Sequence, residues 1–256
     1  MAIFQTRFAH ADPDLLARRT LQKRVDTKFL CRTESLSRIL PPLEPHFQVA
    51  LAGEYTHAPY RTIYWDTRER KSLFDHHRGK RPRFKVRIRH HIGRERSFLE
   101  VKSNRGQGRT SKARFSIPYA AEELTSDHLE TALDNHPSVH PEDLKPAMII
   151  EFNRTTLVGI QLEERMTVDT DLIFRDGERD VALPGLAIVE IKQARWNHQS
   201  PSMQTLRAHK IRATAISKYL TGAQFLWPDL KLNRHKPNLR EIRRVLGKKE
   251  NEPWNN

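Results

Sequence analysis

Residues 83–90 read RFKVRIRH, and this stretch sets the expected fold. Lys85, Arg87 and Arg89 alternate one for one with apolar residues along it. Strict alternation predicts a β-strand that has one charged face and one apolar face.

Other parts of the chain show the same pattern or a similar one. Further strands are expected over Arg24–Leu30, Arg61–Asp66, Ser97–Lys102, Met148–Arg154, Arg165–Asp171 and Ala187–Lys192. Within Arg61–Asp66, the aromatic pair Tyr64 and Trp65 is assigned to core packing. Helices are expected over Asp12–Leu21, Glu34–Leu40, Ala121–Asn135, Gln204–Tyr219 and Asn238–Leu246.

Two arrangements of these strands are compatible with their alternating charged and apolar faces. The charged faces can meet solvent outside a sandwich or barrel, which is the simpler interpretation of any single strand, or they can line a wide barrel. The charges recur as Lys-x-Arg-x-Arg and then twice as Glu-x-Lys, without the small polar residues usual on a solvated face. The joint pattern therefore favours an α+β fold built on a mainly antiparallel closed β-barrel, with helices packed outside.

The amino-acid composition limits the classes of binding partner and the cellular setting that can be expected. The net charge of +14 comes from 45 Lys+Arg against 31 Asp+Glu, an excess that attracts nucleic acid, membrane surfaces or phosphate-rich molecules. Cys31 is the only cysteine, which excludes an intrachain disulfide and fits a reducing, cytoplasmic setting. No apolar run approaches the length of a membrane span, so any membrane association is expected through a partner protein.

Cations that line a confined barrel repel one another unless carboxylates or a bound polyanion neutralise them. Arginine and lysine bind phosphate oxygens well, so a triphosphate or a longer phosphate chain fits such a lining. Glu100, Glu190, Asp169 and Glu151 can either hold Mg²⁺ or Mn²⁺ or pair with neighbouring cations. Metal binding is favoured for Glu190, whereas for Glu151 the ion-pair role is at least as well supported.

A series of motifs then indicates a family. RVDTKF, IYWDT, KVRIRHH, LEVKS, RTSKARF, EFNRTTL, ERMTVDTDL, VEIK and ISKYLTG occur in this order between Arg19 and Gly222. The series resembles the VTC domain, the catalytic domain of the vacuolar transporter chaperone polyphosphate polymerases and their bacterial relatives, in the triphosphate tunnel superfamily. The Glu-x-Glu-x-Lys signature of the related triphosphatases is absent, which argues against that branch.

The resemblance implies roles for individual residues. Glu190 matches the metal ligand, for Mn²⁺ or Mg²⁺, and Asp26 stands where relatives usually carry Glu. The supporting acids are expected to be Asp26, Glu100, Glu151 and Asp169. The phosphate-binding and catalytic residues are expected to be Lys28, Arg87, Arg89, Lys102, Lys112, Arg154, Arg165, Lys192, Ser217 and Lys218.

The expected function is that of a metal-dependent phosphotransferase that moves the γ-phosphate of ATP onto a polyphosphate chain. Residues 1–20 are expected to form a helical extension, 21–226 the tunnel domain, and 227–256 a basic helix and tail. One rival is a triphosphate or polyphosphate hydrolase. Another is a non-catalytic polyphosphate-binding or nucleic-acid-binding protein that uses Lys231–Lys249 as an external basic patch.

Overall fold

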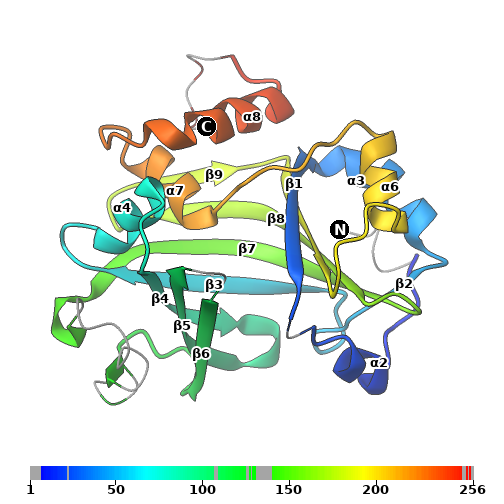
Figure 1. Cartoon of the computed structure of the whole chain (residues 1–256), viewed down its shortest axis with the longest axis horizontal. Coiled ribbons are helices and arrows are strands. Elements are labelled where there is room, and N and C mark those ends of the chain that lie inside the picture. Colours follow the sequence, from blue (N-terminus) through cyan, green and yellow to red (C-terminus); the bar gives the residue numbers. More distant parts are fainter. Residues whose placement is uncertain are drawn as a thin grey trace.

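The computed structural model describes residues 7–21, 23–106, 109–124, 127, 129–130, 140–249, 252 and 254, and only the backbone at 105, 106, 109 and 110. Its strands form one antiparallel sheet in the order β1-β10-β8-β7-β3-β4-β5-β6, with β2 added to β7 and β9 to β8 (Figure 1). The strands are β1 (Val25–Arg32), β2 (Phe47–Val49), β3 (His57–Asp66), β4 (Arg83–His91), β5 (Arg96–Gly106), β6 (Arg109–Ile117), β7 (Lys145–Gly159), β8 (Glu164–Arg175), β9 (Asp180–Leu183) and β10 (Leu186–Gln193).

Helices are short and lie around this sheet. They are α2 (Pro13–Arg18), α3 (Leu36–Ile39), α4 (Lys71–Arg78), α6 (Pro201–Ala208), α7 (Lys218–Leu226) and α8 (Lys236–Leu246). Asp12 caps α2 by accepting a hydrogen bond of 2.7 Å from the backbone N–H of Leu15, and Pro13 begins the helix, as the sequence predicts. No helix in the described part of the chain is long and apolar enough to cross a membrane.

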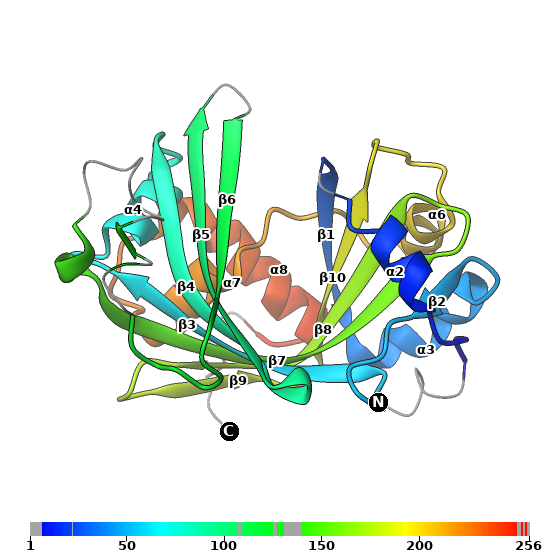
Figure 2. The ribbon, with the colours of Figure 1, turned by 90° about the horizontal axis from the view of Figure 1, so that it is seen from below.

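The sheet bends into a U, with β4, β5 and β6 on one side and β10 and β1 on the other (Figure 2). The predicted closure into a barrel is wrong, because the edge strands β1 and β6 do not pair. The edge of β1 is partly occupied by another segment: Phe29 forms a bridge with Ala213, and the N–H of Thr214 donates to the carbonyl of Lys28 at 2.8 Å. The α+β class and the mainly antiparallel sheet are confirmed.

Apolar side chains cover the outside of the U. Val189 and Ile191 of β10 pack with α3 and α6, and Val86 and Ile88 of β4 pack with Leu144 and other residues that follow β6. The predicted alternation therefore places the apolar residues of these strands on the convex face. Their charged neighbours face the concave side, as in the second of the two arrangements above.

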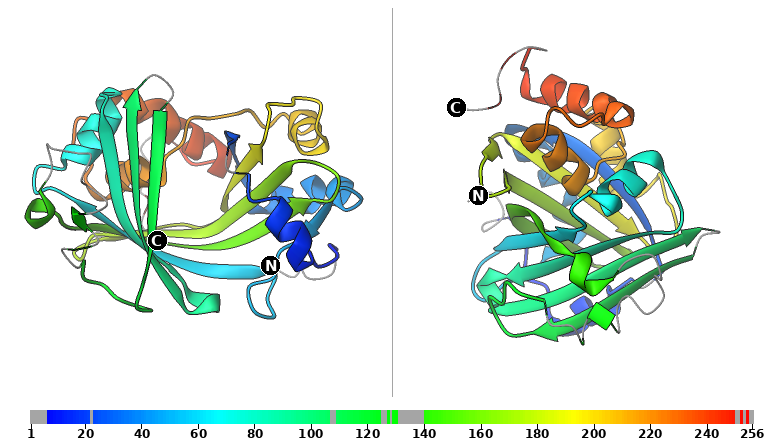
Figure 3. Two further views of the ribbon diagram at one scale, coloured as in Figure 1. Left: turned by 60° about the horizontal axis from the view of Figure 1, so that its bottom comes forward. Right: turned by 90° about the vertical axis from the view of Figure 1, so that its left-hand side faces the viewer.

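One end of the concave face is apolar and carries α7, a helix that the closed-barrel prediction placed outside. Met148 of β7 and Phe174 of β8 pack against α7 at Gly222. A Cβ atom at Gly222 would lie 2.5 Å from the Met148 sulfur and 2.6 Å from a Phe174 ring carbon, so only glycine permits this approach. The helices α7 and α8 thus lie across one end of the U (Figure 3).

The predicted helix over Gln204–Tyr219 is also wrong, because α6 ends at Ala208 and α7 begins at Lys218. The chain between them runs along the edge of β1, where β-branched residues such as Thr214 fit an extended backbone. The helices expected at Asp12–Leu21 and Glu34–Leu40 are present but shorter, and Asn238–Leu246 lies within α8. The expected helix Ala121–Asn135 lies largely outside the described residues.

Candidate functional site

Charged side chains from strands far apart in the sequence converge on the concave face. The antiparallel register places Arg87 opposite Glu100, Lys28 opposite Glu190, and Arg154 opposite Asp169. Cations on this face outnumber carboxylates among the described residues. The cations are Lys28, Lys85, Arg87, Arg89, Lys102, Lys112, Arg114, Arg154, Arg165, Lys192 and Lys218, and the acids are Asp26, Glu100, Asp169 and Glu190.

Glu100 is the centre of the first cluster, and its side chain is only 3% exposed. Arg87 donates to its Oε2 atom from Nε at 2.8 Å and Nη2 at 2.6 Å, and Lys112 Nζ lies 2.8 Å from Oε1. Arg89 and Arg114 stand 3.6 Å away. Burial alone would raise the pKa of Glu100, but the surrounding cations hold that pKa well below its usual range.

Asp169 is the centre of the second cluster and is almost completely buried. Arg154 binds it through two nitrogens, Nε at 2.5 Å and Nη2 at 2.7 Å, and Lys218 at the start of α7 forms an ion pair with the same carboxylate. Burial lowers the pKa of Lys218 to about 8. The nearby Arg154 adds to this lowering, and Asp169 opposes it. The Lys218 ammonium is therefore close to titration at neutral pH.

Glu190 forms a more open arrangement, with its side chain 16% exposed. Lys192 pairs with one carboxylate oxygen, and Lys28 Nζ lies 3.9 Å from the other. Burial opposes ionisation, but these lysines together lower the pKa of Glu190 to about 2, and burial lowers the pKa of Lys192 to about 8. Asp26, opposite Lys192 in the register, accepts a hydrogen bond of 2.9 Å from Arg24.

The segment before α7 joins the two sides of the U. Lys28 Nζ on β1 donates to the carbonyl of Ile216 at 3.0 Å, and Lys85 Nζ on β4 donates to Ser217 Oγ at 3.2 Å. Burial and then the nearby cations lower the pKa of Lys85 well below its usual range. Ser217 and Lys218 are thus brought to the same region as the strand cations.

Lys102 and Arg165 also face this side but carry no carboxylate partner within ion-pair distance among the described residues. Arg165 donates to the carbonyl of Arg19 at 3.4 Å. Lys102 lies opposite Lys85 and Lys112 in the register, so three ammonium groups form one row across β4, β5 and β6. Such a row favours an anionic ligand.

Glu151 is not part of this group. The structure places it on the other face of the sheet, where its carboxylate accepts from Arg175 at 3.1 Å and lies 3.8 Å from Arg61. Along β7, Arg154 faces the concave side, and residues an odd number apart point to opposite faces. Alternation therefore excludes Glu151 as a supporting acid of the site.

Tyr64, assigned to packing in the sequence, contacts the site directly. Its hydroxyl accepts a hydrogen bond of 3.1 Å from Arg87 Nη1, and its ring stacks on Tyr219 at 4.7 Å. The Tyr219 hydroxyl donates in turn to the buried Asp66 at 2.8 Å. Glu100 and Tyr64 therefore both hold Arg87 in place. The i, i+2 spacing of Tyr60, Thr62 and Tyr64 puts them on one face of β3 and could have indicated this role for Tyr64.

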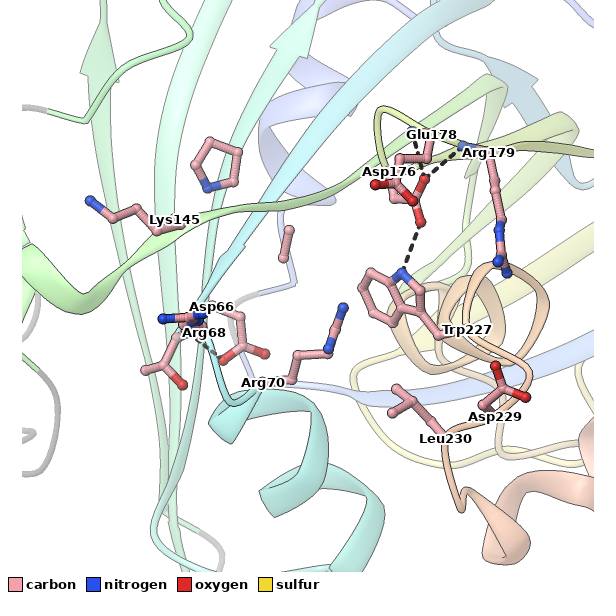
Figure 4. Close-up of a pocket in the computed structure, with 13 residues that line it drawn as sticks. Asp66, Arg68, Arg70, Lys145, Asp176, Glu178, Arg179, Trp227, Asp229 and Leu230 are labelled. Atoms are coloured by element: carbon pink, nitrogen blue, oxygen red, sulfur yellow. Dashed lines mark hydrogen bonds between the residues drawn. The ribbon is translucent and has the colours of Figure 1, made fainter.

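A separate cavity of about 430 Å³ lies beyond Asp66, outside the concave face (Figure 4). Asp66 accepts hydrogen bonds from the backbone N–H groups of Thr67, Ser72 and Leu73, and the last two belong to the first turn of α4. Arg70 lies over the Trp227 ring at 4.1 Å, and the Trp227 indole donates to Asp176. The buried Asp66 and the partly exposed Asp176 in its lining thus have structural partners.

The described residues contain no group of three or more His, Cys, Asp or Glu side chains arranged to hold a metal ion. Three concave carboxylates are surrounded by cations. Glu100 and Asp169 are almost fully buried, whereas Glu190 is partly exposed. Mg²⁺ commonly takes one or two protein carboxylates and completes its shell with water and phosphate oxygens. Glu190 fits one such ligand position, provided that a phosphate ligand supplies others.

A family model for the VTC domain matches residues 23–227. The chain belongs to the VTC domain family. The match spans every strand of the sheet and ends one residue after α7, so it contains all the residues of the concave site. The resemblance identified in the sequence is confirmed.

No curated protein matches this VTC-domain chain. Among solved structures, one similar chain is a putative adenylyl cyclase from Hippeastrum, described as having a dominant triphosphatase activity; it is 12% identical, with a TM-score of 0.46, and the match covers 78% of this chain and 96% of that one. A conserved hypothetical protein from Pyrococcus furiosus is 13% identical, with a TM-score of 0.35 and coverage of 90% and 96%. Likenesses at these TM-scores carry no argument about function.

Proposed function

We propose that the concave face binds a linear phosphate chain and catalyses phosphoryl transfer from ATP to polyphosphate. The observation that carries this proposal is the convergence of cations from both sides of the U around only a few carboxylates. A dense anion would neutralise the excess positive charge, and membership of the VTC domain family supports phosphate as that anion.

The length of the polar row along β4 supports a chain substrate. Lys85, Arg87 and Arg89 face the concave side, and His91 extends the row as a neutral hydrogen-bonding group, because burial and the nearby arginines lower its pKa to about 3. With a rise of about 3.4 Å per residue, this row covers roughly 20 Å, which is more than twice the length of a triphosphate group. The site therefore suits a donor triphosphate and an acceptor chain bound end to end.

In this proposal Arg87, Arg89 and Arg154 bind equatorial phosphate oxygens, and Lys102, Lys112, Lys192 and Lys218 supply further positive charge. The γ-phosphorus–oxygen bond to ADP breaks as a terminal oxygen of the acceptor chain attacks in line, so the protein needs no nucleophile of its own. Fixed cations that match the charge of the transition state would supply most of the rate enhancement.

Arg87 is well suited to this role because Glu100 and Tyr64 already orient its guanidinium. Little reorganisation would then be needed when a phosphate binds. Mn²⁺ or Mg²⁺, held by Glu190 and phosphate oxygens, would neutralise part of the phosphate charge. Ser217 and Lys218 would contact the chain at the end covered by α7. A membrane protein that exports the product, and a cytoplasmic location, remain parts of the same proposal.

The decisive experiment is incubation of the purified protein with ATP and Mn²⁺, followed by sizing of the phosphate products on a gel. Growth of a polymer, with ADP in equal amount to the phosphate incorporated, is the expected result. Release of orthophosphate without chain growth would instead identify a hydrolase. The Arg87→Ala variant is the control that links either activity to the concave face.

A further inference from the structure

The end of the concave face away from α7 contains a cavity of about 340 Å³, and five of its thirteen lining residues are arginines. We name it the arginine pocket, and it is defined by Arg94, Arg96, Arg114, Arg154 and Arg165 with the rings of Tyr60, His91 and Phe98. None of the described residues that line it is acidic. Arg94, Arg96 and Arg114 were not among the site residues expected from the sequence.

The charges of this pocket are only partly neutralised. Arg94 donates to the carbonyl of Leu51 at 2.5 Å and Arg165 to that of Arg19, so both are held by neutral groups. Together with Arg96, they have no carboxylate within ion-pair distance in the part of the chain that the structure describes. Burial, and then the cations Arg24, Arg154 and Arg94, lower the pKa of Arg165.

Each aromatic ring of the pocket already has a packing partner within the protein. Tyr60 stacks on Phe152 with ring centres 5.3 Å apart, and His91 lies against Tyr60 at 4.5 Å. The guanidinium of Arg114 lies 3.6 Å from the centre of the Phe98 ring. The arginines therefore supply most of the ligand contacts that remain open, and their guanidinium groups match phosphate groups best.

The pocket also continues the row of side chains along β4 to which we assign phosphate binding. Arg96 lies opposite His91 and follows the hairpin that joins β4 and β5, so it extends the row formed by Arg87 and Arg89. Arg154 lines the pocket and also binds Asp169, which connects the pocket with the centre of the site. A chain that occupies the central site would enter the arginine pocket as it grows longer.

We propose that the arginine pocket is a chain-length subsite, which binds the phosphate groups of linear polyphosphate that lie beyond a triphosphate. This inference rests on the proposed function, since it assumes that the first phosphates occupy the central site. The pocket would then favour long chains as acceptors over short ones, and Arg154 is the residue that it shares with the central site.

The test is a comparison of Arg96→Ala, and of Arg94→Ala/Arg96→Ala, with the wild-type protein in binding tripolyphosphate and long-chain polyphosphate, without metal. Both arginines are exposed, so the variants should fold. The loss of one charge-assisted contact should weaken long-chain binding roughly ten-fold or more. Tripolyphosphate binding should change less than about two-fold, as should both affinities in Arg38→Ala, an exposed control on α3 at the convex side.

Equal losses for both probes, or no loss for either, would overturn the subsite while leaving the proposed function intact. Failure of the wild-type protein to bind either probe would overturn both. A single-stranded DNA that displaces long-chain polyphosphate from the wild-type protein but not from Arg96→Ala would also contradict the proposal, because the pocket would then be a nucleic-acid site.

Discussion

The two sides of the U differ in how their charge is balanced. The β4–β6 wall carries six cations on its concave face, and Glu100 is the only carboxylate among the described residues of that face. The cations are Lys85, Arg87, Arg89, Lys102, Lys112 and Arg114. The opposite side, which we term the β8–β1 wall, consists of β8, β10 and β1 with Arg154 and Lys218. Apart from Arg165, its cations lie close to Asp169, Glu190 or Asp26. The excess positive charge therefore lies mainly on one wall.

This difference suggests separate tasks. A phosphate chain gains most by lying against the β4–β6 wall, where cations are in excess and the arginines are already oriented. A divalent metal is expected at the β8–β1 wall, where the partly exposed Glu190 lies beside Lys192, whose pKa burial lowers to about 8. Each of the following predictions would break or sharpen this assignment.

The largest effect is expected for Arg87→Ala. The variant should lose about 100-fold or more in kcat/KM, because charge-assisted hydrogen bonds to phosphate contribute roughly 1.5–3 kcal/mol each. Circular dichroism should show an intact fold. Steady-state kinetics with ATP and polyphosphate would check this, and unchanged kcat/KM would exclude the β4–β6 wall as the binding surface.

Glu100→Gln should affect stability more than any exposed substitution. Removal of a buried carboxylate from four cations should cost roughly 3–5 kcal/mol, because the charges that remain are uncompensated. Urea unfolding should show this loss, and added tripolyphosphate should recover more stability in the variant than in the wild type. Glu151→Gln, on the convex face, is the matched control and should cost less than about 1 kcal/mol; equal losses would contradict the comparison.

Glu190→Gln sharpens the assignment of the metal to the β8–β1 wall. The variant should need roughly ten-fold or more Mn²⁺ for half-maximal activity, since an amide is a weaker ligand than a carboxylate. Asp26→Asn is a control on the same wall and should shift the Mn²⁺ requirement less. An unaltered Mn²⁺ titration in Glu190→Gln would remove Glu190 from the metal site.

The lysines of the β8–β1 wall predict a pH dependence. The pKa of Lys218 is about 8, so its ammonium is charged at pH 7 and mostly neutral at pH 9. Anion binding favours the charged form, so affinity for tripolyphosphate should fall as pH rises through 8. Between pH 7 and pH 9 the wild type should lose roughly ten-fold relative to Lys218→Arg, whose guanidinium stays charged. The protonation of the ligand is common to both proteins, and parallel curves would contradict the role of Lys218.

Tyr64→Phe should have the smallest effect. The variant keeps the ring stacked on Tyr219 but loses the acceptor for Arg87, a hydrogen bond worth about 1 kcal/mol, so activity should fall roughly five-fold. Stability should change little. A loss as large as that of Arg87→Ala would instead place the Tyr64 hydroxyl in direct contact with the reacting groups.

Much of the site could be predicted because strand alternation is a local property. Once Arg87 faces the concave side, Arg89 and Lys85 must do so too, and the same rule connects Glu190 with Lys192. Applied consistently, the rule would also have added Arg114 from its spacing to Lys112 and removed Glu151 from its spacing to Arg154.

The parts that failed depend on competition between distant segments. Whether β1 pairs with β6 or with the chain near Ala213 is decided by tertiary packing, and no local pattern in either strand encodes it. The break between α6 and α7 has the same origin, since the chain there leaves the helix to follow β1. The place of α7 on the concave side requires the close approach at Gly222, which helical periodicity does not reveal.

The most direct test of the phosphate-chain site is a calorimetric titration of tripolyphosphate into the wild-type protein, Arg87→Ala and Arg38→Ala. Binding should be clear in the wild type, unchanged in Arg38→Ala, and weakened by at least about ten-fold in Arg87→Ala. Of the two substituted arginines, only Arg87 lies on the concave face. No binding to the wild type, or equal binding to all three proteins, would contradict a phosphate site between the two walls.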